Sequence, residues 1–355
     1  MKPFIFSAQF PRVVFGAGSL QHLEREIDLL GAKRALVLCT PEQRAQAEDI
    51  AKRLGARAVG VYDKAVMHVP IETARAGREE ATRLNADCAV AIGGGSTLGL
   101  GKAIALESGL PILAIPTTYA GSEMTPIQGF TENGVKKTLR DARMLPKTVI
   151  YDAELTLTLP AKLSATSGMN AIAHSVESLY AQDANPIISL MAEESIRVLA
   201  NALPKIVRDT QDLAARGDAQ YGAWLAGASL GAVGMALHHK LCHTLGGSFN
   251  LPHAETHTIV LPHVVAYNRL AAEQAMMRIS RALGLGPNLD AARGLYDLAK
   301  SIGAPLALKD IGMQESDLER AAQIATTNPY YNPRPIERGP IRKLLDDAYF
   351  GRRPS

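Results

Sequence analysis

The first 150 residues alternate short aliphatic runs with longer segments in which apolar residues recur every three or four positions. RALVLC (34–39), DCAVAI (87–92) and PILAI (111–115) have the length and composition of buried strands. Strands that alternate with helices are joined by crossover connections, which produce a parallel sheet covered by helices on both faces. The pattern therefore predicts a doubly wound α/β domain over residues 1–154.

The pattern changes after LTLTLP (155–160). Apolar residues then recur at helical spacing through segments 165–181, 189–207 and 219–245, with Gly or Pro between them. This periodicity predicts an all-helical second domain over residues 155–355. Two domains of unlike architecture are expected to leave a cleft in which a cofactor and a substrate meet.

Composition narrows the class of protein further. The 355 residues include 38 Lys+Arg and 35 Asp+Glu, and this near balance gives no basic footprint for a nucleic acid. No run of 18 apolar, uncharged residues occurs, and the N-terminal sequence lacks a signal-peptide pattern. The three cysteines lie in or beside apolar runs, which favours buried reduced thiols and a cytoplasmic location.

A glycine-rich turn joins one predicted strand to the next predicted helix. Gly93, Gly94, Gly95 and Ser96 follow DCAVAI and open the helical segment TLGLGKAIAL. Such a turn lets backbone N–H groups approach a phosphate, and the helix dipole favours its charge. Leu98 departs from the dinucleotide pattern G-x-G-x-x-G, and a tight turn without a ligand is the alternative.

A hydroxyl-rich loop, PTTYAGSE (116–123), follows the strand PILAI. Ligands of open α/β sheets bind at the carboxyl ends of strands, so this loop is a second candidate ligand site. Its alternative is a loop that satisfies its own backbone groups.

Histidines are concentrated in the second domain, where six of the nine lie between positions 238 and 263. Asn170 and His174 are four residues apart, as are His239 and His243, so each pair projects from one face of a helix. With His253, these side chains could converge on a metal ion or a reacting group. A single histidine is more often structural, and this interpretation is kept for His238, His257 and His263.

Ordered motifs along the whole chain resemble the iron-containing (group III) alcohol dehydrogenases. The motifs are VVFGAGSL (13–20), GGGS (93–96), PTT (116–118), LPKTVIYDAELTLTLP (145–160), SGMNAIAHSVES (167–178), HHKLCHTLGGSFNLPHAETHTIVLPHV (238–264) and NPRPI (332–336). The resemblance implies a Rossmann-like dinucleotide-binding domain followed by a helical domain, the dehydroquinate synthase-like arrangement. It also implies NADH or NADPH as cofactor and a homodimer.

Three positions depart from the usual family pattern. The family binds its metal with one Asp and three His, which correspond here to Asn170, His174, His239 and His253. Asn removes the only anionic ligand, so we expect activity without a bound metal. Gly99 and Tyr119 are the other two departures. Together they resemble a branch that reduces the C=C bond of an unsaturated oxo-dicarboxylate in aromatic-compound catabolism.

This resemblance suggests a role for each candidate residue. His243 and His253 are expected to stabilise and protonate the enolate formed by hydride addition, with His174 and His239 orienting the substrate. Tyr119 is added to the catalytic set. The predicted cofactor-binding residues are Thr40, Gly93, Gly94, Gly95, Ser96, Thr117, Thr118 and Lys136. The candidates for binding the substrate carboxylates are Lys102, Lys136, Tyr119, Tyr330, Tyr331 and Arg334, and most of these could equally be solvated surface side chains.

The sequence leaves two alternatives open. One is a metal-dependent alcohol or aldehyde dehydrogenase of the same superfamily that accepts Asn as a ligand. The other is a nucleotide-binding module without catalysis, which would leave the polar residues of the helical domain unexplained.

Overall fold

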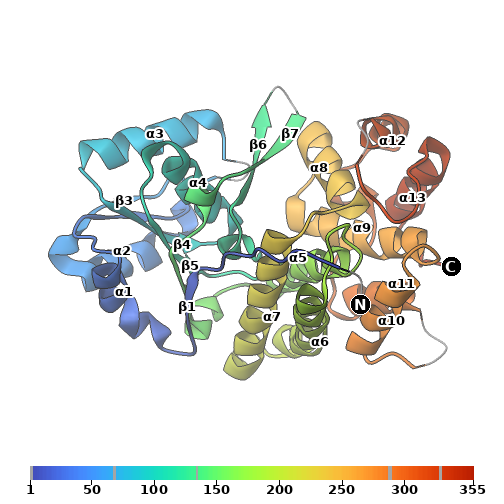
Figure 1. Ribbon diagram of the computed structural model, residues 1–355, viewed down its shortest axis with the longest axis horizontal. Coiled ribbons are helices and arrows are strands. Elements are labelled where there is room, and N and C mark those ends of the chain that lie inside the picture. Colours follow the sequence, from blue (N-terminus) through green and yellow to red (C-terminus); the bar gives the residue numbers. More distant parts are fainter. Residues whose placement is uncertain (1–2, 67–68, 133–134, 287–289, 328–329) are drawn as a thin grey trace. The chain divides into compact units, whose positions relative to one another are not determined.

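The computed structural model describes residues 3–66, 69–132, 135–286, 290–327 and 330–355, without the side chains of 130–137 (Figure 1). The chain divides into two compact units, which are described separately. One, the α/β unit, comprises Gln9–Asn133 and Lys137–Leu159, and the other, the helical unit, consists chiefly of Pro160–Ser355. The predicted fold class, an α/β part followed by an all-helical part, is confirmed.

The α/β unit contains a six-stranded parallel sheet with the order β1-β8-β5-β4-β2-β3. The strands are β1 (Arg12–Phe15), β2 (Ala35–Leu38), β3 (Ala58–Tyr62), β4 (Cys88–Gly93), β5 (Ile112–Pro116) and β8 (Thr148–Tyr151). The helices are α1 (Leu23–Leu29), α2 (Arg44–Leu54), α3 (Ile71–Arg83) and α4 (Gly95–Ser108). A separate two-stranded sheet of β6 (Ile127–Glu132) and β7 (Val135–Arg140), which the sequence pattern did not indicate, follows β5.

Successive residues of the central strands point to opposite faces of this sheet, and helices cover both faces. Val37 of β2 packs with residues of α1 and α2 in one apolar cluster. Its neighbours Leu36 and Leu38 pack with residues of α3 and α4 in another. The central strands are therefore buried on both sides, which explains their continuous aliphatic runs.

Strand order brings the predicted cofactor residues that end or follow β2, β4 and β5, which are all of them except Lys136, to the same end of the sheet. β4 lies between β5 and β2, with Gly93 paired to Pro116 and Ala91 paired to Leu38. The segments that follow these three parallel strands therefore emerge side by side at their carboxyl ends.

The helical unit is built around α5 (Ala161–Leu179), which is buried continuously from Ser164 to Leu179. Helices α6 (Pro186–Arg208), α7 (Leu213–Ala232) and α9 (His253–Asn268) pack against it. The unit is completed by α8 (Leu237–Phe249), α10 (Glu273–Ala282), α11 (Ala291–Ser301), α12 (Leu318–Thr326) and α13 (Arg338–Phe350) (Figure 1).

The apolar pattern over 219–245 predicts one continuous helical segment, but the structure divides this segment between α7 and α8. Val233 has an extended backbone at the break, and the dihedral angles of Ala236 are also not helical. Gly234 N–H donates to Asp183 at 2.9 Å, and Ala236 N–H donates to Glu177 at 2.9 Å. Both carboxylates come from other parts of the unit, so tertiary contacts and not local sequence fix the start of α8.

All three cysteines are buried and none forms a disulfide, as expected. Burial raises the pKa of Cys39 to about 11 and that of Cys88 to about 12. Within the described ranges, the helices lack the combination of length and hydropathy required to cross a membrane.

Candidate active site

The glycine turn of the α/β unit leaves an open surface at the start of α4. Gly93 has φ +152°, and a Cβ atom there would collide with the Thr97 hydroxyl. A Cβ on Gly94 would lie 2.8 Å from the Thr118 methyl group, whereas nothing lies within 4 Å of one on Gly95. The turn thus requires glycine at two positions and exposes the helix N-terminus at the third, which fits a phosphate group.

The neighbouring loop is held against this turn. Thr117 N–H donates to the Gly93 carbonyl at 3.1 Å, and its hydroxyl accepts a 2.8 Å hydrogen bond from the Gln43 amide. Gln43 was not among the predicted site residues. Its proximity follows from the adjacency of β2, β4 and β5, which a single segment of sequence does not reveal.

Thr40 lies just after β2, with an extended backbone. The backbone N–H of Glu42 and the Thr40 hydroxyl lower the pKa of the exposed Glu42 carboxyl. A carboxyl group that ionises readily therefore lies two residues after Thr40, one of the predicted cofactor-binding residues.

Lys102 and Tyr119 are both buried, with 1% and 0% of their surface exposed. The Lys102 ammonium donates to the carbonyls of Ser122 at 2.6 Å and Ile127 at 2.8 Å, and to the Thr125 hydroxyl at 3.0 Å. Burial lowers the pKa of Lys102 to about 7. The Lys102 side chain therefore stabilises the loop after β5. Because its ammonium is buried and hydrogen-bonded to that loop, the geometry does not support the expectation that it binds a substrate carboxylate.

In the helical unit, the predicted histidines come together from α5, α8 and α9. The rings of His174 and His239 stack with centroids 4.9 Å apart, and His243 lies edge-on to His239 at 6.1 Å. His257 connects the third helix to them, with its ring centroid 5.0 Å from that of His239 and 4.3 Å from that of His253. Residues far apart in the sequence thus form one imidazole cluster.

Glu177, which the sequence analysis did not single out, anchors this cluster. It is fully buried and accepts hydrogen bonds from the backbone N–H groups of Ala236 at 2.9 Å and His238 at 2.8 Å. It also contacts His239 Nδ1 at 2.7 Å. Burial raises the pKa of Glu177, but the hydrogen bonds that the carboxylate accepts from His239 and from the Ala236 N–H outweigh this effect and keep the pKa below its ordinary value. The carboxylate occupies the N-terminus of α8, where the helix dipole favours a negative charge.

Three of the four positions that correspond to the family's metal ligands, Asn170, His174 and His239, are connected by hydrogen bonds. Asn170 Nδ2 lies 3.3 Å from His174 Nε2, and His174 Nδ1 lies 2.7 Å from His239 Nε2. With His239 Nδ1 on Glu177, every ring nitrogen of these two histidines already faces a hydrogen-bonding partner. A dication would need lone pairs from both rings directed at one point, so this arrangement does not fit a bound metal.

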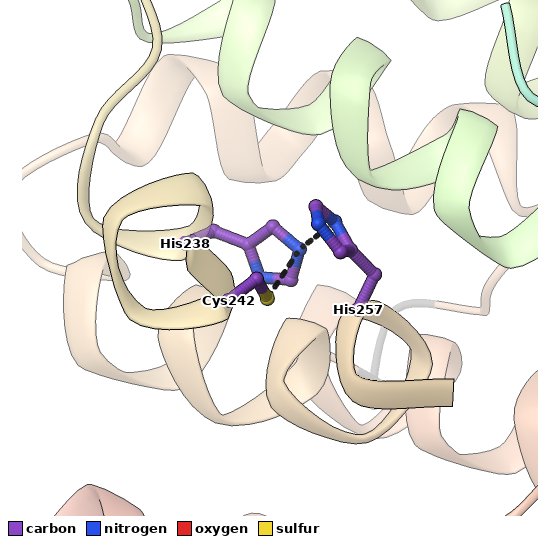
Figure 2. A group of neighbouring side chains, drawn as sticks. All are labelled: His238, Cys242 and His257. Atoms are coloured by element: carbon purple, nitrogen blue, oxygen red, sulfur yellow. Dashed lines mark hydrogen bonds between the residues drawn. The ribbon is translucent and has the colours of Figure 1, made fainter. Parts of the chain in front are cut away.

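Figure 2 shows a second group of side chains, His238, Cys242 and His257. It shares His257 with the imidazole cluster, and the His238 ring lies edge-on to that of His239. Their ligand atoms fall within 4.8 Å of one another, as in sites for soft metals. However, His238 Nε2 and His257 Nδ1 are hydrogen-bonded at 3.0 Å, with Cys242 Sγ 3.7 Å from the same His238 nitrogen. Burial lowers the pKa of His238 to about 3 and that of His257 well below its ordinary value, so this hydrogen bond joins two neutral rings.

The remaining candidates are dispersed. His263 is buried, and burial lowers its pKa to about 4, with Asp347 and Lys343 as its charged neighbours. The Arg334 guanidinium stacks on the Tyr267 ring at 4.0 Å, and the Lys240 ammonium lies 5.7 Å from the Tyr330 ring. Tyr331 is exposed, and the side chain of Lys136 lies outside the described part of the chain.

Family models match both parts of the chain. The model described as iron-containing alcohol dehydrogenase covers residues 11–153, and that of the C-terminal part of the Fe-containing alcohol dehydrogenase family covers 164–349. The chain belongs to the iron-containing alcohol dehydrogenase family.

Within this family, the chain is most usefully compared with three individual relatives. The chain is 66% identical to a maleylacetate reductase of Burkholderia cepacia over 355 residues, which is 100% of each chain. A crystal structure of maleylacetate reductase from Agrobacterium tumefaciens matches with 52% identity and a TM-score of 0.95, again over 100% of both chains. A 1,3-propanediol oxidoreductase structure is more distant, at 27% identity and a TM-score of 0.91 over 97% of this chain and 100% of that one.

Proposed function

We propose that this chain reduces the C=C bond of maleylacetate, giving 3-oxoadipate, with NADH or NADPH as the hydride donor. The observation that carries the proposal is the 66% identity, over the whole chain, to an enzyme named maleylacetate reductase. The neutral Asn170 beside a histidine cluster supports the same reaction and not alcohol oxidation at a metal ion.

Hydride addition to the alkene carbon distal to the ketone produces an enolate, and protonation of the adjacent carbon completes the reduction. An enolate is stabilised by hydrogen-bond donors directed at its oxygen. We assign this role and the proton transfer to His243 and His253, which border the cluster and are partly exposed. His174, His239 and Glu177 form the buried support behind them.

The reaction is proposed to proceed without a bound metal. Asn170 contributes no charge to offset a dication, and the ring nitrogens of His174 and His239 are engaged with their neighbours. Electrostatic stabilisation of the enolate then falls to imidazole N–H groups.

The open start of α4 beside Thr118 is the proposed site for the cofactor's pyrophosphate. Glu42, beside Thr40, would repel a 2′-phosphate, so NADH is the expected better cofactor. We also propose a cytoplasmic homodimer. Phe4, Ile5 and Phe6 are 43%, 93% and 40% exposed, and an apolar segment of this kind is suited to burial by a second copy.

The test is NADH and NADPH oxidation on addition of maleylacetate, before and after treatment with a chelator. We expect turnover that survives chelation. No turnover with either cofactor would refute the substrate, and loss on chelation with rescue by Fe²⁺ or Zn²⁺ would favour the metal-dependent alternative.

His243→Asn should lower kcat by about 100-fold, because a proton donor to the enolate is removed. His22→Asn, a substitution in the short helix Ser19–His22 of the α/β unit, is the matched control and should leave the rate unchanged. A normal rate in His243→Asn would remove this residue from the mechanism.

A further inference from the structure

Four buried side chains form a continuous hydrogen-bonded chain from Asn170 to Glu177. The contacts are 3.3 Å from Asn170 Nδ2 to His174 Nε2, 2.7 Å from His174 Nδ1 to His239 Nε2, and 2.7 Å from His239 Nδ1 to Glu177. All four residues are at most 5% exposed, so bulk water does not compete for these groups.

The direction of this chain follows from its Glu177 end. The backbone groups that contact the carboxylate are N–H donors, from Ala236, His238 and His239, and they cannot accept a proton from it. Glu177 is therefore an acceptor, and His239 Nδ1 must carry the hydrogen that it donates.

Each later proton position is then determined in turn. A neutral imidazole has one N–H group and one lone pair, so His239 Nε2 is the bare nitrogen. His174 must donate to it from Nδ1, which leaves His174 Nε2 bare. The Asn170 amide turns its NH₂ group toward that lone pair, and its Oδ1 has no hydrogen-bond partner among the described residues.

We propose that Glu177 is a positioning residue that fixes the tautomers of His239 and His174 and, through them, the orientation of the Asn170 amide. The N–H groups of both histidines donate to other members of this hydrogen-bonded series and are not available to a substrate. The consequence for catalysis, which rests on the proposed function, is that His243 or His253 protonates the enolate. The tautomers themselves do not depend on which substrate is used.

The direct test is the ¹⁵N spectrum of the wild-type protein labelled at its nine histidines, with resonances assigned by single His→Asn substitutions. A protonated and a bare ring nitrogen have well-separated shifts. We expect Nδ1–H with bare Nε2 for both His174 and His239. An Nε2–H tautomer or an imidazolium at either residue would overturn the proposal, whether or not the protein folds after substitution of Glu177.

Two substitutions of Glu177 separate positioning from packing. Glu177→Gln retains one carbonyl acceptor for His239 Nδ1, whereas Glu177→Leu retains similar bulk and no acceptor. We expect the glutamine variant to keep the wild-type tautomers and most of kcat. The leucine variant should show a mixture of tautomers and a kcat lowered by about ten- to a hundredfold, with a smaller change in KM.

Equal tautomers and equal kcat in the leucine and glutamine variants would contradict the role of Glu177. Folding of both is checked by helical circular dichroism and by the fluorescence of Trp224, the single tryptophan, which lies in α7. If the wild type shows the expected tautomers but does not turn over maleylacetate, the proposed function fails while the positioning role stands.

Discussion

At the scale of single residues, Asn170 determines whether two neutral imidazoles can link it to Glu177. An aspartate at position 170 would place a carboxylate at each end of this series of hydrogen bonds. His174 Nε2 and His239 Nδ1 would then both need to donate a hydrogen. His174 Nδ1 and His239 Nε2 would then face each other at 2.7 Å as two lone pairs, unless a proton or a cation lay between them. The amide avoids this conflict because its NH₂ group donates to His174.

Asn170→Asp is therefore expected to create affinity for a divalent cation. Isothermal titration with Zn²⁺ should show binding about tenfold or more tighter than in the wild type, because an anionic ligand and two lone pairs become available. Asn170→Ala is the matched control, since it removes the amide without adding charge, and it should not gain this affinity. Equal Zn²⁺ binding in the aspartate and alanine variants would contradict the argument.

At the scale of elements, the ends of strands and the starts of helices carry both candidate sites. α4 begins at the glycine turn after β4, and α8 begins where Glu177 accepts its first N–H groups. Each helix start leaves backbone donors without partners inside the helix. One set is open to a ligand, and the other is filled by a side chain of the protein.

Gly94→Ala tests the open helix start. Its Cβ would lie 2.8 Å from the Thr118 methyl group and force that side chain away, so we expect the KM for NADH to rise by about tenfold. Steady-state kinetics with varied NADH measures this change, and Gly339→Ala, where nothing lies within 4 Å, is the control.

Thr118→Ser removes the obstructing methyl group and retains the hydroxyl. The double variant Gly94→Ala/Thr118→Ser should recover part of the NADH affinity. No recovery, together with a normal KM in the control, would show that the contact with Thr118 is not the cause.

At the scale of the whole molecule, buried histidines make the helical unit sensitive to acid. Burial lowers the pKa of His238 to about 3 and that of His263 to about 4. In the unfolded chain these groups take up protons near pH 6.5. Between about pH 6.5 and 4 the unfolded state therefore binds more protons, and the free energy of unfolding falls as the pH is lowered.

His263→Gln should weaken this dependence. His263 lies away from the cluster, with Asp347 and Lys343 as its charged neighbours. Urea unfolding followed by Trp224 fluorescence at pH 6, 5.5 and 5 measures the free energy of unfolding. As the pH falls, this free energy should decrease less in the variant than in the wild type, by about 1.4 kcal/mol per pH unit. Parallel curves for the two proteins would show that His263 does not remain neutral when folded.

Much of this protein follows from local sequence patterns. The aliphatic strands of the α/β unit, the glycine turn at 93–96 and the helical spacing of Asn170 with His174 are set by residues within a few positions of one another. Side-chain periodicity and the conformational freedom of glycine act over that range, so these features and the fold class could be predicted.

The hydrogen bonds that connect the histidines depend on tertiary structure, because they join residues that are far apart in the sequence. Glu177 meets His239 across 62 positions of sequence, Gln43 meets Thr117 across 74, and the break between α7 and α8 depends on Glu177 and Asp183. Such contacts depend on which helix or strand lies beside which, and no local pattern encodes that. The amino-acid sequence places the neutral amide of Asn170 and the ring of His174 on one helix face. Where the protons of His174 and His239 lie depends on the folded chain, because a buried carboxylate accepts a hydrogen bond from His239.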